Sequence, residues 1–253
     1  MSIGRMISAR GLAMGSALIA CEFSGIVCAE FRRRGHEAWS CDVLPTEGNP
    51  AWHIQGDAIE AAYSRPWDIL IAHPPCTYLA NSGAKHLYAG MKKENGPNAE
   101  RWANLGAAAQ FFLTLWNAPI PRKCIENPIM LGHARRLFGI PKHNQIIQPY
   151  EYGHGETKAT CLWLHNLPDL EPTDEVAGRE QKVFRMAPSP DRWKDRSRTF
   201  RGIAQAMADQ WGALITDTPN GVSAASAPSA RSCDVSSPFH EANTGTKGQR
   251  NNG

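Results

Sequence analysis

The chain has 253 residues, of which 42% are hydrophobic and 20% are charged, and its formal net charge is +3. This composition is typical of a soluble globular protein, and no apolar run approaches the ~20 residues that a membrane-spanning helix needs. The seven cysteines form no Cys-x-x-Cys pair. Because this pattern argues against a disulfide framework and a zinc cluster, we expect reduced thiols, a cytoplasmic location and no metal site.

The two ends of the chain differ in composition from the middle. Residues 1–15 are small and unpatterned, and residues 216–253 are rich in Ser, Ala, Pro, Asn and Gly. We predict disorder in both segments and one folded domain over 16–215. The residues before Cys21 also resemble a lipoprotein cleavage site, although they fit a first buried strand better.

Apolar runs and turn residues predict that strands and helices alternate along the domain. The predicted strands cover residues 16–21, 37–41, 67–72, 122–128, 146–150 and 161–164. The predicted helices cover residues 26–34, a short stretch after Gly56-Asp57, 99–117, and a final helix from 199 or 201 to 211. This order predicts an α/β fold with a mostly parallel sheet and helices on both faces.

Cys76 stands just beyond the end of a predicted buried strand. The strand stops at Pro74-Pro75, because neither proline can donate a ladder hydrogen bond. Open α/β sheets bind their ligands outside the carboxyl ends of their strands. A thiol in this place is suited to nucleophilic attack if its surroundings favour the thiolate, and the alternative is a buried cysteine in a proline-rich turn.

A second predicted strand ends in a similar way, with Glu126 and Asn127 followed by Pro128. Two strands therefore end in reactive or polar side chains followed by proline. The polar segment 82–98, which follows Cys76 and contains glycine, reads as a loop, and a long loop of this kind is usually functional or disordered.

Together these segments resemble the C5-cytosine DNA methyltransferase family, especially its compact phage and prophage members. Phe23-Ser24-Gly25-Ile26 is similar to the glycine turn that holds S-adenosylmethionine, and Pro74-Pro75-Cys76-Thr77 is similar to the Pro-Cys nucleophile loop. Glu126-Asn127-Pro128 is similar to the Glu-Asn motif, and Gly153–Thr160 and Arg196–Trp211 match the placement of later motifs. The resemblance covers roughly residues 17–212 and depends on the order and spacing of the segments.

The resemblance implies a Rossmann-like methyltransferase fold and a role for each matching catalytic residue. Cys76 would add to C6 of cytosine, which activates C5 as a nucleophile. Glu126 would bind the N3 and N4 edge of the base, and burial would keep it protonated or sharing a proton. Asn127 would fix the loop, and Lys158 would contact O2 of the base or a phosphate.

The resemblance also implies that S-adenosylmethionine is the cofactor. The cofactor-binding residues that it indicates are Phe23, Ser24, Gly25, Asp42, Asp57 and Pro74. Asp42 would accept hydrogen bonds from the ribose hydroxyls and Asp57 from the adenine amine. The alternatives are that Asp42 initiates a turn and that Asp57 caps a helix.

Duplex DNA with a flipped target base is the implied partner, and we expect a monomer. A basic segment near the C-terminus supplies the candidate phosphate contacts, unless it is simply a solvated charged face. These candidates are Arg192, Lys194, Arg196, Arg198 and Arg201.

Several positions depart from the family pattern. Val27 and Cys28 replace two glycines, Lys158 is the only cation where the family has two arginines, and Ile203 replaces an asparagine. The interval Pro168–Arg192 is too short for a target-recognition region. Two alternatives therefore remain: the same chemistry on a free cytosine nucleotide or RNA, and a degenerate DNA-binding relative without activity. An amino-group methyltransferase fits less well, because such enzymes carry an aromatic residue after Pro-Pro where this chain has Cys76.

Overall fold

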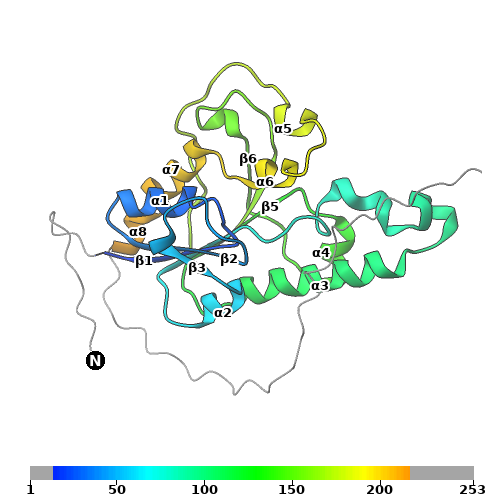
Figure 1. Cartoon of the computed structure of the whole chain (residues 1–253), viewed down its shortest axis with the longest axis horizontal. Coiled ribbons are helices and arrows are strands. Elements are labelled where there is room, and N and C mark those ends of the chain that lie inside the picture. Colours follow the sequence, from blue (N-terminus) through cyan, green and yellow to red (C-terminus); the bar gives the residue numbers. More distant parts are fainter. Residues whose placement is uncertain (1–13, 217–253) are drawn as a thin grey trace, which may run out of the picture. The chain divides into compact units, whose positions relative to one another are not determined.

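The centre of the structure, a computed structural model that describes residues 14–216, is a seven-stranded sheet with helices on both faces (Figure 1). The strand order is β3-β2-β1-β4-β5-β7-β6. The first five of these strands are parallel, and β7 runs antiparallel to both of its neighbours. The predicted Rossmann-like α/β fold is confirmed. The predictions for residues 1–13 and 217–253 lie outside the described residues.

The structure gives the bounds of each element. The strands are β1 (Ser16–Ala20), β2 (Glu37–Asp42), β3 (His53–Gln55), β4 (Ile69–Ala72), β5 (Lys123–Pro128), β6 (Gln145–Ile147) and β7 (Thr160–His165). The α-helices are α1 (Ile26–Arg33), α2 (Ala58–Tyr63), α3 (Ala99–Trp116), α4 (Gly132–Phe138), α5 (Lys182–Arg185), α6 (Arg192–Ser197), α7 (Arg201–Gln210) and α8 (Gly212–Thr216). Short 3-10 turns are η1 (Pro50–Trp52), η2 (Asn81–Leu87), η3 (Ala89–Met91), η4 (Lys93–Asn95) and η5 (Pro149–Glu151).

The sheet separates two apolar layers. On one face, Ile19 and Ile71 pack with α1, α7 and α8 through residues such as Phe31. On the other face, Leu18 and Leu70 pack with α2, α3 and α4. The central strands β1 and β4 are therefore apolar on both faces, as expected for parallel strands that are covered by helices on each side.

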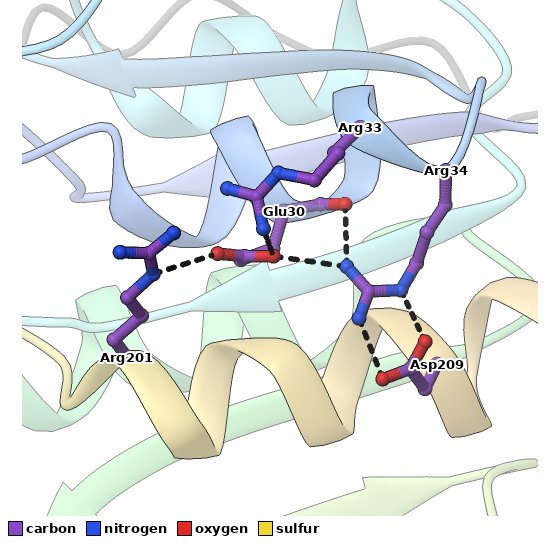
Figure 2. A network of polar contacts seen from close by, with 5 residues as sticks. All are labelled: Glu30, Arg33, Arg34, Arg201 and Asp209. Carbon is purple, nitrogen blue, oxygen red and sulfur yellow. Dashed lines mark hydrogen bonds and ion pairs between the residues drawn. The ribbon is translucent and has the colours of Figure 1, made fainter.

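A buried carboxylate ties α1 to α7 (Figure 2). The side chain of Glu30 is 2% exposed and pairs with Arg33, with Arg34 at 3.0 Å and with Arg201 at 3.4 Å. Arg34 also forms an ion pair with Asp209 of α7. Burial alone would raise the pKa of Glu30, but the hydrogen bonds from the arginines hold it below its ordinary value. The basic residues at the end of α1 therefore serve the packing of two helices.

The structure contains elements that the sequence patterns do not predict. β3 has three residues and α4 seven, lengths at which periodicity carries little signal, and α6 lies in a charged segment. The predicted final helix is interrupted at Trp211, which separates α7 from α8. The predicted loop 82–98 is largely folded into η2, η3 and η4.

Gly202 lies where α7 meets the segment before β7. A Cβ at this position would lie 1.9 Å from the carbonyl oxygen of Tyr152, and the Gly202 N–H donates to Nε2 of His154 at 2.9 Å. We expect Gly202→Ala to lower the free energy of unfolding by about 3 kcal/mol, because the backbone of α7 must move. Chemical denaturation measures this loss. The control is Gly56→Ala, which has no heavy atom within 4 Å of the added Cβ, and equal losses in both variants would contradict the account.

Candidate active site

The strand register brings two side chains of the site to the same level of the sheet. Ala72 of β4 pairs with Ala20 of β1 on one side and with Ile125 of β5 on the other. His73 and Glu126, each one residue further along, therefore lie side by side at the carboxyl edge. This edge is where open α/β sheets bind their ligands.

His73 and Glu126 form a buried hydrogen-bonded pair. Nδ1 of His73 lies 2.7 Å from Oε2 of Glu126, and the two side chains are 11% and 15% exposed. Burial alone would lower the pKa of His73, but the hydrogen bond and charge of Glu126 raise it above its ordinary value. Nε2 of His73 is buried, and it has no hydrogen-bond partner among residues 14–216. The pair therefore holds a proton at the edge of the sheet.

His73 also changes the state expected for Glu126. From the sequence, burial is expected to keep this carboxyl protonated or sharing a proton. Burial does act in that direction, but the hydrogen bond and charge of His73 hold the pKa of Glu126 below its ordinary value. The proton of the pair therefore resides mainly on the imidazole. Sequence reasoning missed His73, although its place directly before Pro-Pro-Cys at a strand end was an available signal.

Cys76 is exposed, whereas the other cysteines of the described region are buried or half-buried. Desolvation by the surrounding protein raises the pKa of its thiol, and the charges of Lys158 and Arg196 act in the opposite direction. The side-chain amide of Asn127 donates to the carbonyl oxygen of Pro74 at 2.9 Å. This buried bond fixes the Pro-Pro turn that presents the thiol.

Lys158 joins the same group of side chains from the segment between β6 and β7. Its charge lowers the pKa of both Cys76 and Glu126. The Nζ atom donates to the carbonyl oxygen of Arg196 at 3.0 Å, so that α6 holds the ammonium group in place. The structure thus brings together all four predicted catalytic residues, namely Cys76, Glu126, Asn127 and Lys158.

The glycine turn after β1 contains an acid that the sequence analysis did not select. Glu22 is 4% exposed, and its carboxylate accepts backbone hydrogen bonds from Val27 at 2.7 Å and Cys28 at 3.2 Å. These two donors belong to the first turn of α1, at the two positions where the family that the sequence resembles has glycines. Burial raises the pKa of Glu22 to about 6, against an ordinary value of 4.5.

The raised pKa of Glu22 predicts a specific dependence of stability on pH. Protonation of Glu22 stabilises the folded state, because the folded protein binds this proton more tightly than the unfolded chain does. This stabilisation is fully present below pH 4.5 and is lost as the pH rises through about 6. The free energy of unfolding of wild type relative to Glu22→Gln should therefore fall by about 2 kcal/mol between pH 4 and pH 7. Urea titrations across this range measure the difference, and parallel curves would contradict the assignment.

The predicted cofactor residues Phe23, Ser24 and Gly25 form the turn itself. Gly25 has φ of 68°, and an added Cβ would lie 3.1 Å from Cα of Gly48. Phe23 is 6% exposed, because Trp193 and Arg198 of the α6 region lie over its ring at 6.1 Å and 5.9 Å. The backbone of this turn is therefore closely packed, and α6 covers its aromatic residue.

The two predicted aspartates lie near Cys21, which directly follows β1 and has a left-handed conformation with φ of 57°. Desolvation raises the pKa of Cys21, and the charges of Asp42 and Asp57 raise it further. Oδ1 of Asp42 accepts from the backbone N–H of Leu44 at 3.0 Å, and Oδ1 of Asp57 caps α2. The turn-forming and helix-capping contacts considered for these residues are thus present.

These residues fit the chemistry of S-adenosylmethionine. Its sulfonium and ammonium groups are cationic, and its ribose and adenine amine donate hydrogen bonds, so acidic groups around a glycine turn are suitable partners. Asp42 is the last residue of β2, and Glu22 and Asp57 follow β1 and β3 by two residues, so that all three acids lie at the same carboxyl edge. Carboxylates at this edge of the sheet can bind the cationic groups of S-adenosylmethionine and accept hydrogen bonds from its hydroxyl and amine groups. These residues therefore fit the cofactor.

The predicted phosphate contacts are largely engaged within the protein. Arg198 pairs with Glu47 at 2.7 Å and also with Asp195, and Arg201 pairs with Glu30. Lys194 pairs with Asp191, and Arg196 and Arg192 donate to backbone carbonyl oxygens. Much of the charge that the sequence offers to DNA in this segment is thus used in holding α6 and α7.

Comparisons with known proteins give no match by sequence but a similarity to solved structures. No protein-family model matches the sequence, and neither does any curated protein. Among solved structures, the chain is similar to a protein described as a DNA modification methyltransferase encoded within a prophage (E. coli), with 12% identity and a TM-score of 0.42. The match covers 68% of this chain and 55% of that one, so the chain spans about half the length of the solved protein. A similarity of this size does not identify the function.

Two features are absent from the part of the chain that the structure describes. In the region 14–216, no helix is long and apolar enough to cross a membrane, and His, Cys, Asp and Glu side chains form no group that could hold a metal ion. The fold and the carboxyl edge together define an α/β protein with an exposed thiol, a buried His-Glu pair and three acids around a glycine turn.

Proposed function

We propose that this chain transfers the methyl group of S-adenosylmethionine to C5 of cytosine in DNA, through a covalent bond between Cys76 and C6 of the base. One observation carries the proposal. The exposed thiol of Cys76 shares the carboxyl edge with the His73–Glu126 pair and with Lys158. The two strands that support Cys76 and Glu126, β4 and β5, are neighbours in the sheet.

The cysteine supplies the activation that cytosine needs. The thiolate adds to C6, and the electron pair of the C5–C6 double bond moves into the ring, which makes C5 nucleophilic. After the methyl group is attached, C5 loses its proton, and the thiolate leaves from C6 as the double bond returns. The charge of Lys158 favours the thiolate, and it opposes the desolvation that raises the thiol pKa.

The His73–Glu126 pair would stabilise the negative charge that develops on the base. As the thiolate adds to C6, N3 of the ring becomes more basic and needs a hydrogen-bond donor or a proton. Glu126 lies in the second half of β5, beside the end of β4, where it would meet the N3 and N4 edge of the base. The proton that the pair holds, mainly on His73, then balances the charge that develops on the ring.

Glu22 and the two aspartates around the glycine turn would hold the cofactor. Its sulfonium group supplies an activated methyl group when the cofactor is bound. Glu22 would face its cationic part, and Asp42 and Asp57 would accept from its hydroxyl and amine donors. Phe23, Ser24, Gly25 and Pro74 would line the same place through the turn after β1 and the turn after β4. Since a cytosine inside a duplex cannot reach Cys76, the target base would leave the stack.

The test is methyl transfer from labelled S-adenosylmethionine to three substrates: duplex DNA, deoxycytidine monophosphate and transfer RNA. We expect label in the DNA, recovered as 5-methyldeoxycytidine after digestion and mass spectrometry. Label in the nucleotide or the RNA alone would move the same chemistry to another substrate. Label on N4 of cytosine would contradict the C5 mechanism, and a failure to bind the cofactor would indicate a relative without activity.

A further inference from the structure

A cavity of about 530 Å³ opens beside Cys76. The turn from Cys76 to Gly83 forms one side, and η3 and the first turns of α3 form the others. Its volume lies within the range of small-ligand sites. Neither Glu126 nor His73 lines it, so the cavity lies beyond the place proposed for the target base.

The lining of the cavity combines aromatic and hydrogen-bonding side chains. Tyr78 and Tyr88 supply rings, and the guanidinium of Arg101 stacks on Tyr78 at 4.4 Å. His86 and Asn104 also line the cavity, and neither side chain has a hydrogen-bond partner among residues 14–216. Nε of Arg101 is buried, and it too is unpartnered in this part of the chain. Such groups stack on a planar base and bond to its edge.

The segment between β4 and α3, which lines the cavity, also carries exposed lysines. Lys85, Lys92 and Lys93 are exposed, and the structure gives them no ion pair within the described region. Arg198 and Arg201, which the sequence analysis selects as phosphate contacts, are instead paired with carboxylates. Within the segment between β4 and α3, these exposed lysines therefore lie on η2 and η4 and in the residue between η3 and η4.

The rim of the cavity also exposes an apolar side chain. Met91 is 52% exposed and has φ of 61°, directly after Gly90 with φ of 57°. Met91 thus belongs to the lining of the cavity, and two lysines follow it directly in the sequence. The turns between β4 and α3 extend at the right of Figure 1, beside the first half of α3. An apolar residue among cations is typical of surfaces that insert between DNA bases.

We propose that this cavity receives the nucleotide next to the target cytosine, and that Lys92 and Lys93 bind the phosphates of the same strand. The inference rests on the proposed function, since the target base must first be placed at Cys76. It assigns DNA contact to the turns between β4 and α3, a role that sequence reasoning gave to residues 192–201. It also supplies a way to read the sequence context beside the target base.

The test is equilibrium binding of the full chain to labelled duplexes, with and without an abasic site beside a central cytosine. Wild type should lose about tenfold in affinity when the neighbouring base is removed, because stacking and edge contacts are lost. His86→Ala and Asn104→Ala should bind the intact duplex more weakly and show little further loss on the abasic one. Lys92→Ala and Lys93→Ala should each reduce the slope of log affinity against log salt by about 0.9.

Arg65→Ala is the matched control for charge. Arg65 is half-exposed and precedes β4, whereas Cys76 follows that strand, so the two lie at opposite edges of the sheet. This variant should keep the salt slope and the abasic penalty of wild type. The inference is wrong if wild type binds both duplexes equally, if the cavity variants keep the full abasic penalty, or if the lysine variants match Arg65→Ala. A failure of methyl transfer would appear in the separate labelling assay, so the two proposals are tested independently.

Discussion

Cys76→Ala is expected to lose methyl transfer to DNA by at least about 10⁴-fold while it still binds S-adenosylmethionine. The variant retains the glycine turn and the acids around it, but it lacks the thiol that adds to C6 of the base in the proposed mechanism. Radiolabel transfer under saturating substrate measures the first quantity, and isothermal calorimetry measures the second. Because Cys76 is exposed, the substitution leaves no cavity in the core.

Cys161→Ala is the control for the loss of a thiol. Cys161 is buried in β7, and burial raises the pKa of its thiol to about 11, so it is not a nucleophile. This variant should transfer methyl groups at a rate close to wild type. If Cys76→Ala kept its activity, or if both cysteine variants lost it equally, the covalent mechanism would be contradicted.

His73→Gln is expected to reduce kcat/KM by about 10²-fold near neutral pH, and to change the shape of the pH profile. Under the proposed mechanism, the reactive form of wild type requires a thiolate at Cys76 and a proton on the His73–Glu126 pair. The pKa values of Cys76 and His73 both lie above their ordinary values. The rate should therefore rise with pH and then level off as the pair begins to lose its proton.

The variant lacks the second requirement. Its rate should continue to rise with pH beyond the point at which wild type levels off, until the Cys76 thiol itself has titrated. A purely structural defect would lower the whole profile without changing its shape, so the shape is the decisive readout. Thermal melting of both proteins provides the control for folding. If the two profiles were parallel, the role of His73 in holding the proton would be contradicted.

Much of the fold can be predicted from the sequence because its signals are local. The run Ile69–Ala72 is apolar and ends at two prolines, and the run that ends at Pro128 behaves in the same way, so each strand and its end is visible in the chain itself. The order of these segments is enough to predict an α/β sheet with Cys76 and Glu126 at one edge. Short elements such as β3 cannot be predicted in this way, because three residues are too few to show the alternation of apolar and polar residues that marks a strand.

The remaining features of the site depend on contacts between distant parts of the chain. His73 and Glu126 are 53 positions apart, and only the register of β4 against β5 pairs them. Arg198 meets Glu47 across 151 positions, and this contact removes a charge that the sequence presents as free. The role of Glu22 likewise depends on the path of the turn after β1, which brings its carboxylate to the N-terminus of α1.

The most direct test of the covalent mechanism is the trapping of a complex on duplex DNA that contains 5-fluorocytosine. Fluorine at C5 cannot leave as a cation, so an adduct formed after methyl transfer cannot release the thiolate. Incubation with S-adenosylmethionine should give a protein-DNA species that survives denaturation, with the base linked to the peptide containing Cys76 by mass spectrometry. The adduct should be absent without the cofactor and absent in Cys76→Ala. If methyl transfer to normal DNA were measured but no adduct formed, or if the adduct lay on another residue, the central proposal would be contradicted.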